Sequence, residues 1–455
     1  MENVRELALD MLMEVLEKEK YSHLVIRSVL EKYNYIDVRD KAFIKRVVEG
    51  TLEQLIRIDY VLDQFSKVPV RKMKPLIRTL MRLSVYQLLF MDQVPDGAVC
   101  NEAVKLAGKR GFKGLSGFVN GVLRNIARNR ENIRYPDRSA DRAKALSVRY
   151  SMPEWLIGFW DQAYGEERTE EIVKGLLAEH PVTVRMRAGL SKEKLEEWIQ
   201  DLSERKIQVQ SHGYHAQAFT LRGTEGIQNL PGYGDGLFMV QDVSSMLAVE
   251  AAGPYLFQED KELCVVDVCA APGGKSLHMA EKISGRGTVL SRDLTENKVS
   301  LIRDNIDRMG ISNVTVRVWD ALVFDENLLE KADVVLADLP CSGLGVMGKK
   351  RDIKYRITRK AMEELADLQR RILDVVWKYV KPGGILIYST CTINPEENEQ
   401  MADWFVQNHP FEFQSLSPYL PDPLKEQGAG GTLQFFPGIQ ESDGFFIARL
   451  VRKGK

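Results

Sequence analysis

The chain has 455 residues, of which 44% are hydrophobic and 28% are charged, and its formal net charge is −1. This composition is ordinary for a globular protein, and the length allows two to four domains at roughly 100–200 residues each. The near-neutral balance excludes a globally basic nucleic-acid binder, and the hydrophobic content allows a large core without a disulfide scaffold.

Residues 1–135 are predicted to form an all-α domain. Leu7, Met11 and Val15 repeat at the spacing of one helical face, and no proline occurs before Pro69. The opening segment MENVRELALD has acids where a signal peptide is basic and then apolar, and no apolar run approaches the roughly 20 residues that span a bilayer. We therefore expect a cytoplasmic protein that has no contact with a membrane.

Charge is distributed unevenly along the chain. Residues 101–150 hold twelve Lys or Arg against four acids, and the segment GKKRDIKYRITRK at 348–360 holds seven bases against one acid. Local basic surfaces are typical of proteins that bind a polyanion, and solvated helix faces give the same pattern. Charge alone leaves both interpretations open.

Residues 145–232 are predicted to form a small α+β domain after a polar, basic linker at 134–147. HPVTVRMRA has the pattern of a strand, SKEKLEEWIQDLSERK that of a helix opening on Ser191, and IQVQSHGYHAQAFTLRG that of further strands. His212 and His215 have no Cys or His partners nearby in the sequence. We interpret them as surface histidines and expect no metal site.

Residues 235–455 are predicted to form a Rossmann-like α/β domain. Five short apolar runs occur there, with helical stretches between most of them: LCVVDV, GTVLS, NVTVRVW, ADVVLA and GGILIYS. This alternation predicts a parallel sheet covered by helices on both faces. Ligands of such sheets bind at the carboxyl ends of the strands.

The segment DVCAAPGGKS at 267–276 ends the first of these strands. Gly273 and Gly274 let a ligand approach the backbone, and the amides of the following helix point to the same place. Asp293 ends the second strand, at about the offset of a ribose-binding acid, and Asp320 ends the third. Acids and a glycine loop around one crevice suit a nucleoside with little phosphate.

An NTPase is the rival interpretation of this segment. GGKS is similar to the tail of a P-loop, G-x-x-x-x-G-K-[ST], and VVLAD is similar to a strand that binds Mg²⁺. The first glycine of a P-loop would have to stand at position 269, which is a cysteine. Its absence would spoil the phosphate cradle, so we disfavour an NTPase.

Two of the five cysteines stand where a ligand is expected. No C-x-x-C pair occurs, so a zinc knuckle is not expected, and Cys264 within an apolar strand is interpreted as core. Cys341 follows the fourth strand and Cys391 the fifth, and these strands are expected to be neighbours. A single buried cysteine is often a packing residue, whereas two at adjacent strand ends favour chemistry.

The segment NPEEN after Cys391 has the pattern of a helix start. Asn394 suits the N-cap, Pro395 the first helical position, and Glu396 and Glu397 the first turn. The pattern therefore requires no catalytic role for these residues. A thiol beside a helix N-terminus has a lowered pKa, which favours a reactive thiolate at Cys391.

Together, CAAPGGKS, DLPCSG and YSTCTINPEENE resemble the motifs of the RNA cytosine-5 methyltransferases of the Sun/Nop type. VQDVSSMLA at 240–248 and DGFFIARL at 443–450 resemble that family too. The N-terminal half, which contains FIKRVVEGTL, LMRLSVYQLLFMD and FVNGVLRNIAR, looks like a NusB-type helical RNA-binding domain. This order of domains resembles the RsmB (Sun/Fmu) family, whose members methylate one cytosine in 16S rRNA. The resemblance covers nearly the whole chain.

The resemblance implies S-adenosylmethionine as the methyl donor. It also implies 16S rRNA as the partner, free or in an early small-subunit particle, and we expect the protein to act as a monomer. The implied cofactor-binding residues are Cys269, Ala270, Ala271, Pro272, Gly273, Gly274, Lys275, Asp293, Asp320 and Asp338. Cys391 is the implied nucleophile, and Cys341 the second cysteine, which assists product release.

Relatives often carry an Arg-rich stretch with His-Pro after the Cys341 motif, where this chain has GKKRD, so the detail of RNA contact stays open.

The chemistry of cytosine explains why a methyltransferase needs thiols and a carboxylate at its active site. C5 is a poor nucleophile, and a thiolate that adds to C6 turns the ring into an enamine with electron density on C5. We assign this attack to Cys391, the hydrogen bonds to the cytosine edge to Asp338, and the release step to Cys341. The target base must leave its stack, so a loop cytosine is the expected substrate.

Two further hypotheses remain beside this one. An RNA-binding assembly factor with an inactive methyltransferase fold would carry the same basic regions, but it would not need both cysteines. A methyltransferase that acts on tRNA is disfavoured only by the NusB-like half. In either case RNA contacts through the basic regions predict binding that weakens steeply with salt.

Overall fold

The structure is a computed structural model, and it describes residues 3–33, 35–224, 226–253 and 262–454. Its contacts divide the chain into two compact units, which we call the helical unit (1–178 and 347–356) and the sheet unit (179–346 and 357–455). This division is coarser than the three predicted domains, whose boundaries stay a prediction. Within the described residues, no helix combines the length and apolar character needed to cross a membrane.

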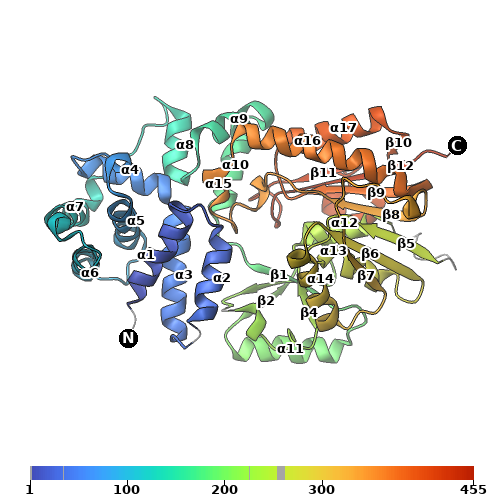
Figure 1. The fold of residues 1–455 in the computed structure, drawn as a ribbon, viewed down its shortest axis with the longest axis horizontal. Coiled ribbons are helices and arrows are strands. Elements are labelled where there is room, and N and C mark those ends of the chain that lie inside the picture. Colours follow the sequence, from blue (N-terminus) through green and yellow to red (C-terminus); the bar gives the residue numbers. More distant parts are fainter. Residues whose placement is uncertain (1–2, 34, 225, 254–261, 455) are drawn as a thin grey trace. The chain divides into compact units, whose positions relative to one another are not determined.

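The helical unit is all-α over its described residues, and this was predicted for residues 1–135 (Figure 1). Its helices are α1 (Val4–Leu16), α2 (Ser22–Lys32), α3 (Val38–Glu53), α4 (Leu55–Phe65), α5 (Pro75–Phe90), α6 (Asp96–Lys109), α7 (Ser116–Arg128), α8 (Arg142–Tyr150), α9 (Glu154–Tyr164), α10 (Glu166–Leu177) and α15 (Ile353–Arg356). Buried aliphatic side chains of α1, α3, α5, α6 and α7 form one core. Gly50 lets α3 pack closely on α5, because a Cβ at this position would lie 2.0 Å from Cζ of Tyr86.

The second half of the predicted linker at 134–147 is helical, so this part of the prediction is wrong. Asp141 caps α8 by accepting a hydrogen bond from the backbone amide of Lys144 at 3.0 Å. Leu146 and Val148 are then buried. The polar composition of the segment therefore reflects the exposed face of a helix rather than a linker.

Several charged side chains of the basic segment at 348–360 form ion pairs and hydrogen bonds within the helical unit. Arg351 forms ion pairs with Glu49 at 3.1 Å and Glu53 at 2.9 Å, and the Lys354 ammonium donates to the backbone oxygen of Glu53 at 2.8 Å. These partners lie at the carboxyl end of α3, where cations are stabilised by the helix dipole. Asp352 also accepts hydrogen bonds from Ser22. Burial lowers the pKa of Lys354 to about 7. Arg351 and Lys354 are therefore structural, which neither of the two interpretations of the basic segment anticipated.

The basic region at 101–150 keeps more of its charge exposed. Six of its twelve bases pair with carboxylates: Lys105, Lys109, Arg110, Arg130, Arg138 and Arg142. The other six are exposed and have no carboxylate partner among the described residues: Lys113, Arg124, Arg128, Arg134, Lys144 and Arg149. This region therefore presents a net positive surface.

The sheet unit begins with a small antiparallel sheet in the order β2-β3-β1-β4. Its strands are β1 (Val182–Met186), β2 (Gln208–Ser211), β3 (Ala218–Arg222) and β4 (Phe238–Val240), with α11 (Lys192–Glu204) between β1 and β2. As predicted, Ser191 caps α11 by accepting a hydrogen bond from the amide of Lys194. Trp198 of α11 packs against Phe219 and Phe238 of the sheet.

The larger sheet has the order β10-β12-β9-β8-β5-β6-β7, with β11 paired to β12. Its strands are β5 (Leu263–Asp267), β6 (Gly287–Asp293), β7 (Val314–Val318), β8 (Ala332–Asp338), β9 (Val380–Thr390), β10 (Phe411–Phe413), β11 (Thr432–Phe435) and β12 (Phe445–Arg452). The five predicted strands β5 to β9 all pair in parallel. The antiparallel strands β10, β11 and β12 were not predicted as part of the sheet.

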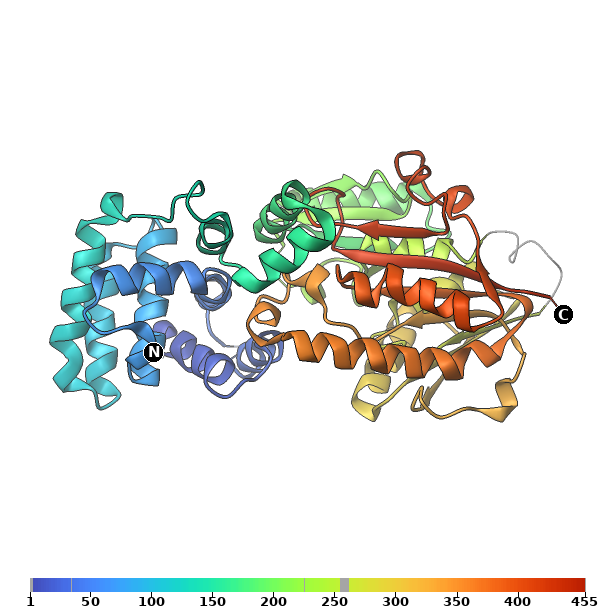
Figure 2. The same cartoon turned by 90° about the horizontal axis from the view of Figure 1, so that it is seen from above.

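Helices cover both faces of the larger sheet, as predicted. They are α12 (Val243–Glu250), α13 (Gly274–Lys282), α14 (Glu296–Met309), α16 (Arg359–Val376) and α17 (Glu399–Asn408). Successive strand residues alternate between two cores, one shared with α12 and α13 and the other with α16 and α17. Figures 1 and 2 show α16 and α17 side by side on their face. Because β5, β8 and β9 are parallel neighbours, their carboxyl ends lie side by side at the same end of the sheet.

Candidate active site

The loop after β5 makes a tight turn into α13. Gly273 has φ +105°, a left-handed conformation, and it directly precedes α13. A Cβ at Gly273 would lie 3.0 Å from Leu277 Cδ1 and 3.3 Å from Ile302 Cγ2. Only glycine fits this conformation without strain. The turn points the first amides of α13 toward the strand ends, where a helix N-terminus favours an anionic ligand group.

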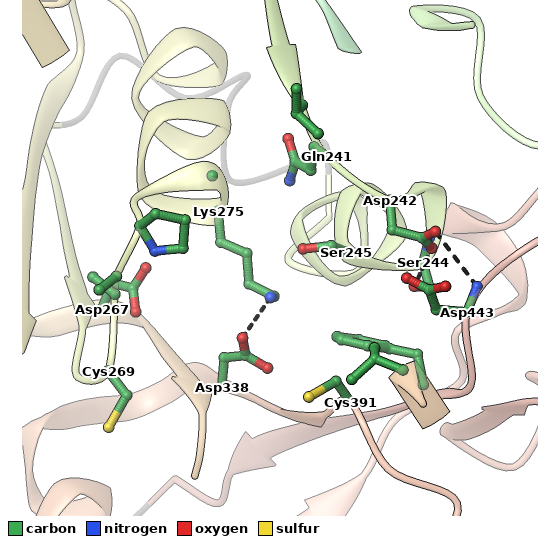
Figure 3. A pocket seen from close by; sticks show the side chains of 17 residues that line it. Gln241, Asp242, Ser244, Ser245, Asp267, Cys269, Lys275, Asp338, Cys391 and Asp443 are labelled. Atoms are coloured by element: carbon green, nitrogen blue, oxygen red, sulfur yellow. Dashed lines mark hydrogen bonds and ion pairs between the residues drawn. The ribbon is translucent and has the colours of Figure 1, made fainter. Parts of the chain in front are cut away.

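A cavity of about 230 Å³ opens beside this loop (Figure 3). Its lining comes from the ends of β4, β5, β8 and β9, the N-terminal parts of α12 and α13, and the start of β12. The lining residues are Val240, Gln241, Asp242, Ser244, Ser245, Asp267, Cys269, Ala270, Ala271, Pro272, Gly274, Lys275, Asp338, Val346, Cys391, Asp443 and Phe445. Four of these are acids and Lys275 is the cation, so the cavity suits a positively charged ligand and disfavours a triphosphate.

The two cysteines predicted to face one crevice meet. Their Sγ atoms are 3.4 Å apart. The parallel pairing of β8 and β9 places Asp338 opposite Ser389, and each cysteine follows just beyond. Cys391 lines the cavity, whereas Cys341 is not among the lining residues. The contact with Cys391 and burial together raise the pKa of the Cys341 thiol well above its usual value.

Asp338 joins three of the elements that meet here. Its Oδ2 accepts a hydrogen bond from the Lys275 ammonium of α13 at 2.6 Å, and its Oδ1 accepts one from the Ser389 hydroxyl of β9 at 2.9 Å. Figure 3 shows the Lys275 side chain reaching across the cavity to Asp338. Both carboxylate oxygens are therefore oriented, and each keeps a lone pair for a ligand.

The segment NPEEN does more than start a helix. Asn394 caps it through the amide of Glu396 and Pro395 takes the first position, as predicted, but the segment is a three-residue 3₁₀ turn, and α17 begins only at Glu399. A single turn has a much smaller dipole than a full helix. The predicted thiolate stabilisation of Cys391 by a helix start is therefore not supported by the fold.

Glu397 is the functional candidate that the sequence analysis missed. It is fully buried, and it accepts hydrogen bonds from the Ser342 amide at 2.8 Å, the Asn394 amide group at 2.8 Å and the Gln369 amide group at 3.0 Å. Ser342 directly follows Cys341, so Glu397 fixes the loop that carries this thiol. Burial raises the pKa of Glu397. The helix-start pattern gave no sign that this acid turns inward.

The predicted nucleoside acids lie outside this cavity lining. Asp293 is buried at the end of β6, where it accepts hydrogen bonds from the amides of Ala271 at 3.0 Å and Leu294 at 2.8 Å and pairs with Lys298 at 3.0 Å. Asp320 is exposed two residues beyond β7. Asp293 therefore braces the loop that follows β5, whereas the exposed Asp320 accepts a hydrogen bond from the Leu322 amide at 2.9 Å.

Asp267, which the sequence analysis did not single out as a site residue, lines the cavity. It is 1% exposed, and its Oδ2 accepts a hydrogen bond from the Ser276 hydroxyl at 2.6 Å. Burial raises the pKa of Asp267 to about 7, with Asp338 and Asp293 adding to the rise and Ser276 and Lys275 opposing it. Its position as the last residue of β5 was the signal that could have found it.

The interpretation of His212 and His215 as surface residues is wrong. His212 is 6% exposed and bonds the backbone oxygen of Glu441 at 2.7 Å. His215 lies 3.0 Å from Glu250, which also approaches His278 at 3.4 Å. The Lys282 ammonium pairs with the same Glu250 oxygen at 2.6 Å, so this carboxylate already has a cationic partner.

Comparisons with known proteins match three parts of the chain to described families. Residues 254–451 match the family described as 16S rRNA methyltransferase RsmB/F, residues 2–128 the NusB family, and residues 152–228 a ferredoxin-like domain of RsmF/B-like methyltransferases. The chain is 36% identical over 461 residues to the probable ribosomal RNA small subunit methyltransferase B of Bacillus subtilis, covering 99% of each protein. It is 32% identical to the protein of the same name from Synechocystis, again over 99% of each. The solved structure of PH0851, 24% identical, has the same fold over 99% of both chains, with a TM-score of 0.78.

The first prediction concerns the stability contributed by Glu397. Glu397→Ala leaves the donors of Ser342, Asn394 and Gln369 unpaired in the interior, so we expect a loss of about 2–4 kcal/mol in the free energy of unfolding. Glu396→Ala, which removes a partly exposed ion pair with Arg359, should cost less than about 1 kcal/mol. Urea unfolding of both variants measures the difference, and equal losses would contradict the role of Glu397.

The second prediction is the pH dependence of stability caused by Asp267. Folding raises its pKa to about 7, so the folded state holds this proton more tightly than the unfolded state does. Stability should therefore fall as pH rises from about 4 to about 7, by up to about 4 kcal/mol. Asp267→Asn should remove this loss, whereas Asp304→Asn, at an exposed position of α14, should keep it. Denaturant unfolding at a series of pH values tests the prediction, which fails if the Asp267→Asn and wild-type profiles are parallel.

Proposed function

This chain belongs to the 16S rRNA methyltransferase RsmB/F family, and we propose that it transfers a methyl group from S-adenosylmethionine to C5 of a cytosine in 16S rRNA through a covalent cysteine–C6 intermediate. The observation that carries the proposal is the contact between Cys341 and Cys391, whose sulfurs lie 3.4 Å apart beside the cavity. One thiolate at this place can add to C6 of a pyrimidine, and a second thiol beside it can assist the reversal of that addition.

The loop after β5 fits S-adenosylmethionine as the donor. The cradle at Gly273 has no room for a side chain, and the acidic lining suits a cationic sulfonium. When bound, this cofactor supplies the methyl group as an electrophile. The residues that would hold it are Cys269, Ala270, Ala271, Pro272, Gly273, Gly274 and Lys275 of the loop, with Asp293, Asp320 and Asp338.

The residues of the chain divide the remaining work. Cys391, which lines the cavity, adds as thiolate to C6 of the flipped base and makes C5 nucleophilic. Asp338, held by Lys275 and Ser389, accepts hydrogen bonds from the cytosine edge at its amino group or ring nitrogen. After methylation the C5 proton passes to solvent water, its C–H electron pair re-forms the C5=C6 double bond, and the C6–S bond breaks to expel the Cys391 thiolate. Cys341, in contact with the Cys391 sulfur, assists this release.

The helical unit supports RNA as the substrate. Its residues 2–128 match the NusB family, and six exposed bases between Lys113 and Arg149 have no carboxylate partner among the described residues. Such a surface contributes salt-dependent affinity for a phosphate backbone. The names of the matched relatives favour small-subunit rRNA over tRNA. An inactive assembly factor would have no need of two thiols in contact.

The third prediction tests the reaction and the substrate together. Wild-type protein should transfer labelled methyl from S-adenosylmethionine to naked 16S rRNA, with the label mapping to C5 of one cytosine, and not to tRNA. Cys391→Ser should reduce the rate at least about a thousandfold, because the hydroxyl is a far weaker nucleophile, while cofactor binding measured by calorimetry is kept. Undiminished transfer by Cys391→Ser, or label on another atom, would refute the proposal.

The fourth prediction concerns product release. Cys341→Ala should accumulate a protein–RNA adduct that survives a denaturing gel, because the Cys391–C6 bond forms but is cleaved slowly. The double variant Cys341→Ala/Cys391→Ser is the control, since it lacks the nucleophile and should form no adduct. If Cys341→Ala turns over normally and leaves no adduct, Cys341 has no part in release.

A further inference from the structure

A second cavity, of about 320 Å³, lies within the helical unit beside α4 and α8. These two helices are in contact, and Figure 1 shows them as neighbours. Ligand pockets of proteins measure roughly 300–1,000 Å³, so this cavity has room for one small group. The lining residues are Arg57, Tyr135, Pro136, Arg138, Ala145, Leu146 and Arg149.

Most of this cavity is formed by a segment that lies between two matched domains. The NusB match ends at residue 128, and the ferredoxin-like match begins at residue 152. Six of the seven lining residues lie between these limits, and Arg57 is the exception. What the cavity binds must therefore be inferred from its own side chains.

One face of α4 holds Tyr135 in place. Gln64 accepts a hydrogen bond from the Arg134 amide at 3.1 Å and donates one to the Arg134 carbonyl at 3.0 Å. The Tyr135 hydroxyl accepts from Nη2 of Arg57 at 3.1 Å, and the Tyr135 ring lies nearly parallel to that of Tyr60. The three residues of α4 are spaced by three and four positions, so they share one helical face. Tyr135 is nevertheless 44% exposed, so an ordered aromatic ring is presented to solvent.

Three of the lining residues are arginines, and their charge is only partly compensated. Arg138 forms an ion pair with Glu170 at 2.6 Å. The Arg57 side chain donates hydrogen bonds only to the neutral Tyr135 hydroxyl among the described residues. Arg149 is exposed, and it has no side-chain hydrogen bond or ion pair within the described part of the chain. Because the lining contains no carboxylate, two positive charges remain available to an anionic ligand.

The combination of an aromatic ring with unpaired guanidinium groups matches a base that is attached to a phosphate. Bases of single-stranded RNA stack on tyrosine rings, and arginine donates pairs of hydrogen bonds to phosphate oxygens. Pro136, Ala145 and Leu146 add apolar surface to the same cavity. An inorganic anion would leave the ring and this apolar surface without a partner. An RNA duplex is equally unsuitable, because its bases are paired and stacked inside the helix.

We propose that this cavity binds one unpaired nucleotide of the RNA substrate, with the base stacked on Tyr135 and the phosphate bound by Arg57 and Arg149. The inference rests on the proposed function for the identity of the RNA. This nucleotide is not the target cytosine, because the cavity belongs to the helical unit and both thiols belong to the sheet unit. Its role is to add affinity and to fix the RNA at a second point.

A short oligouridylate and the duplex that it forms with oligoadenylate test the stacking contact. Fluorescence anisotropy with the full-length chain gives both affinities in the absence of the methyl donor. In Tyr135→Ala we expect the single strand to bind about 5- to 100-fold more weakly, the loss typical of one stacked base. The affinity for the duplex should stay within about twofold, since a paired base cannot enter the cavity. Tyr135→Phe keeps the ring and should bind the single strand within about threefold of wild type.

Tyr35→Ala is the matched control for the loss of an exposed ring. Tyr35 is a tyrosine of the same unit and is 70% exposed. It lies just before α3, whereas α4 follows the other end of that helix. This variant should bind the single strand as wild type does. Wild-type affinity of Tyr135→Ala for the single strand, or equal losses for single strand and duplex, would overturn the inference.

Arg149→Gln tests the phosphate contact separately. Because Arg149 has no described partner to lose, this substitution should leave the fold intact, and it keeps the test valid if Tyr135→Ala is unstable. The slope of log affinity for oligouridylate against log salt should become shallower by about 0.7, the value for one phosphate contact on a single strand. Tyr135→Ala should keep the wild-type slope, because a stacked base releases no counterions. An unchanged slope in Arg149→Gln would remove this residue from the site and overturn the assignment of the phosphate.

The binding results can be separated from the proposed reaction. If the chain fails to methylate 16S rRNA but Tyr135→Ala selectively loses affinity for the single strand, the proposed function fails and the inference stands. If methylation is found at C5 and Tyr135→Ala binds oligouridylate as wild type does, the inference alone fails.

Discussion

The contact between the sulfurs of Cys341 and Cys391 depends on one constraint, the parallel pairing of β8 with β9. Parallel neighbours end at the same edge of a sheet, and the register that sets Asp338 opposite Ser389 brings the residues just beyond both strands into one space. A slip of one residue would turn the side chains of one strand to the other face. The hydrogen bond from Ser389 to Asp338 and the one from the Ser342 amide to Glu397 then hold the two loops in this register.

The charge of the cavity follows from the same geometry. Strand ends and loops from both sheets bring Asp242, Asp267, Asp338 and Asp443 together with the cation Lys275. Gathering carboxylates in a partly buried space is costly unless donors or cations compensate. Part of the compensation is internal, from Lys275 and the hydroxyls of Ser276 and Ser389, and Asp242 accepts hydrogen bonds from the hydroxyls of Ser244 and Ser442. Four carboxylates against one lysine still leave the lining acidic, which is why the cavity is better suited to a sulfonium than to a phosphate.

Sequence patterns predicted the parts of this site that depend on local chemistry. The glycine turn after β5, the five parallel strands with β8 beside β9, and the meeting of Cys341 with Cys391 all follow from residue spacing and the rules of parallel sheets. Glu397 could not be found in this way, because its role comes from partners distant in the sequence, such as Ser342 and Gln369. The structural role of Arg351 in the basic segment could not be predicted for the same reason, because the partners of Arg351 on α3 lie about 300 residues earlier in the chain.

The environments of the two thiols explain how neighbours at 3.4 Å can have different roles. Two thiolates at this distance would repel each other, so at most one of them is ionised. The contact with Cys391 and burial raise the pKa of the Cys341 thiol, and the charge of Glu397 adds to the rise. Cys341 therefore keeps its proton, and it stands outside the cavity lining to which Cys391 belongs. Part of the difference between two chemically identical groups thus comes from a buried acid whose sequence pattern indicates only a helix start.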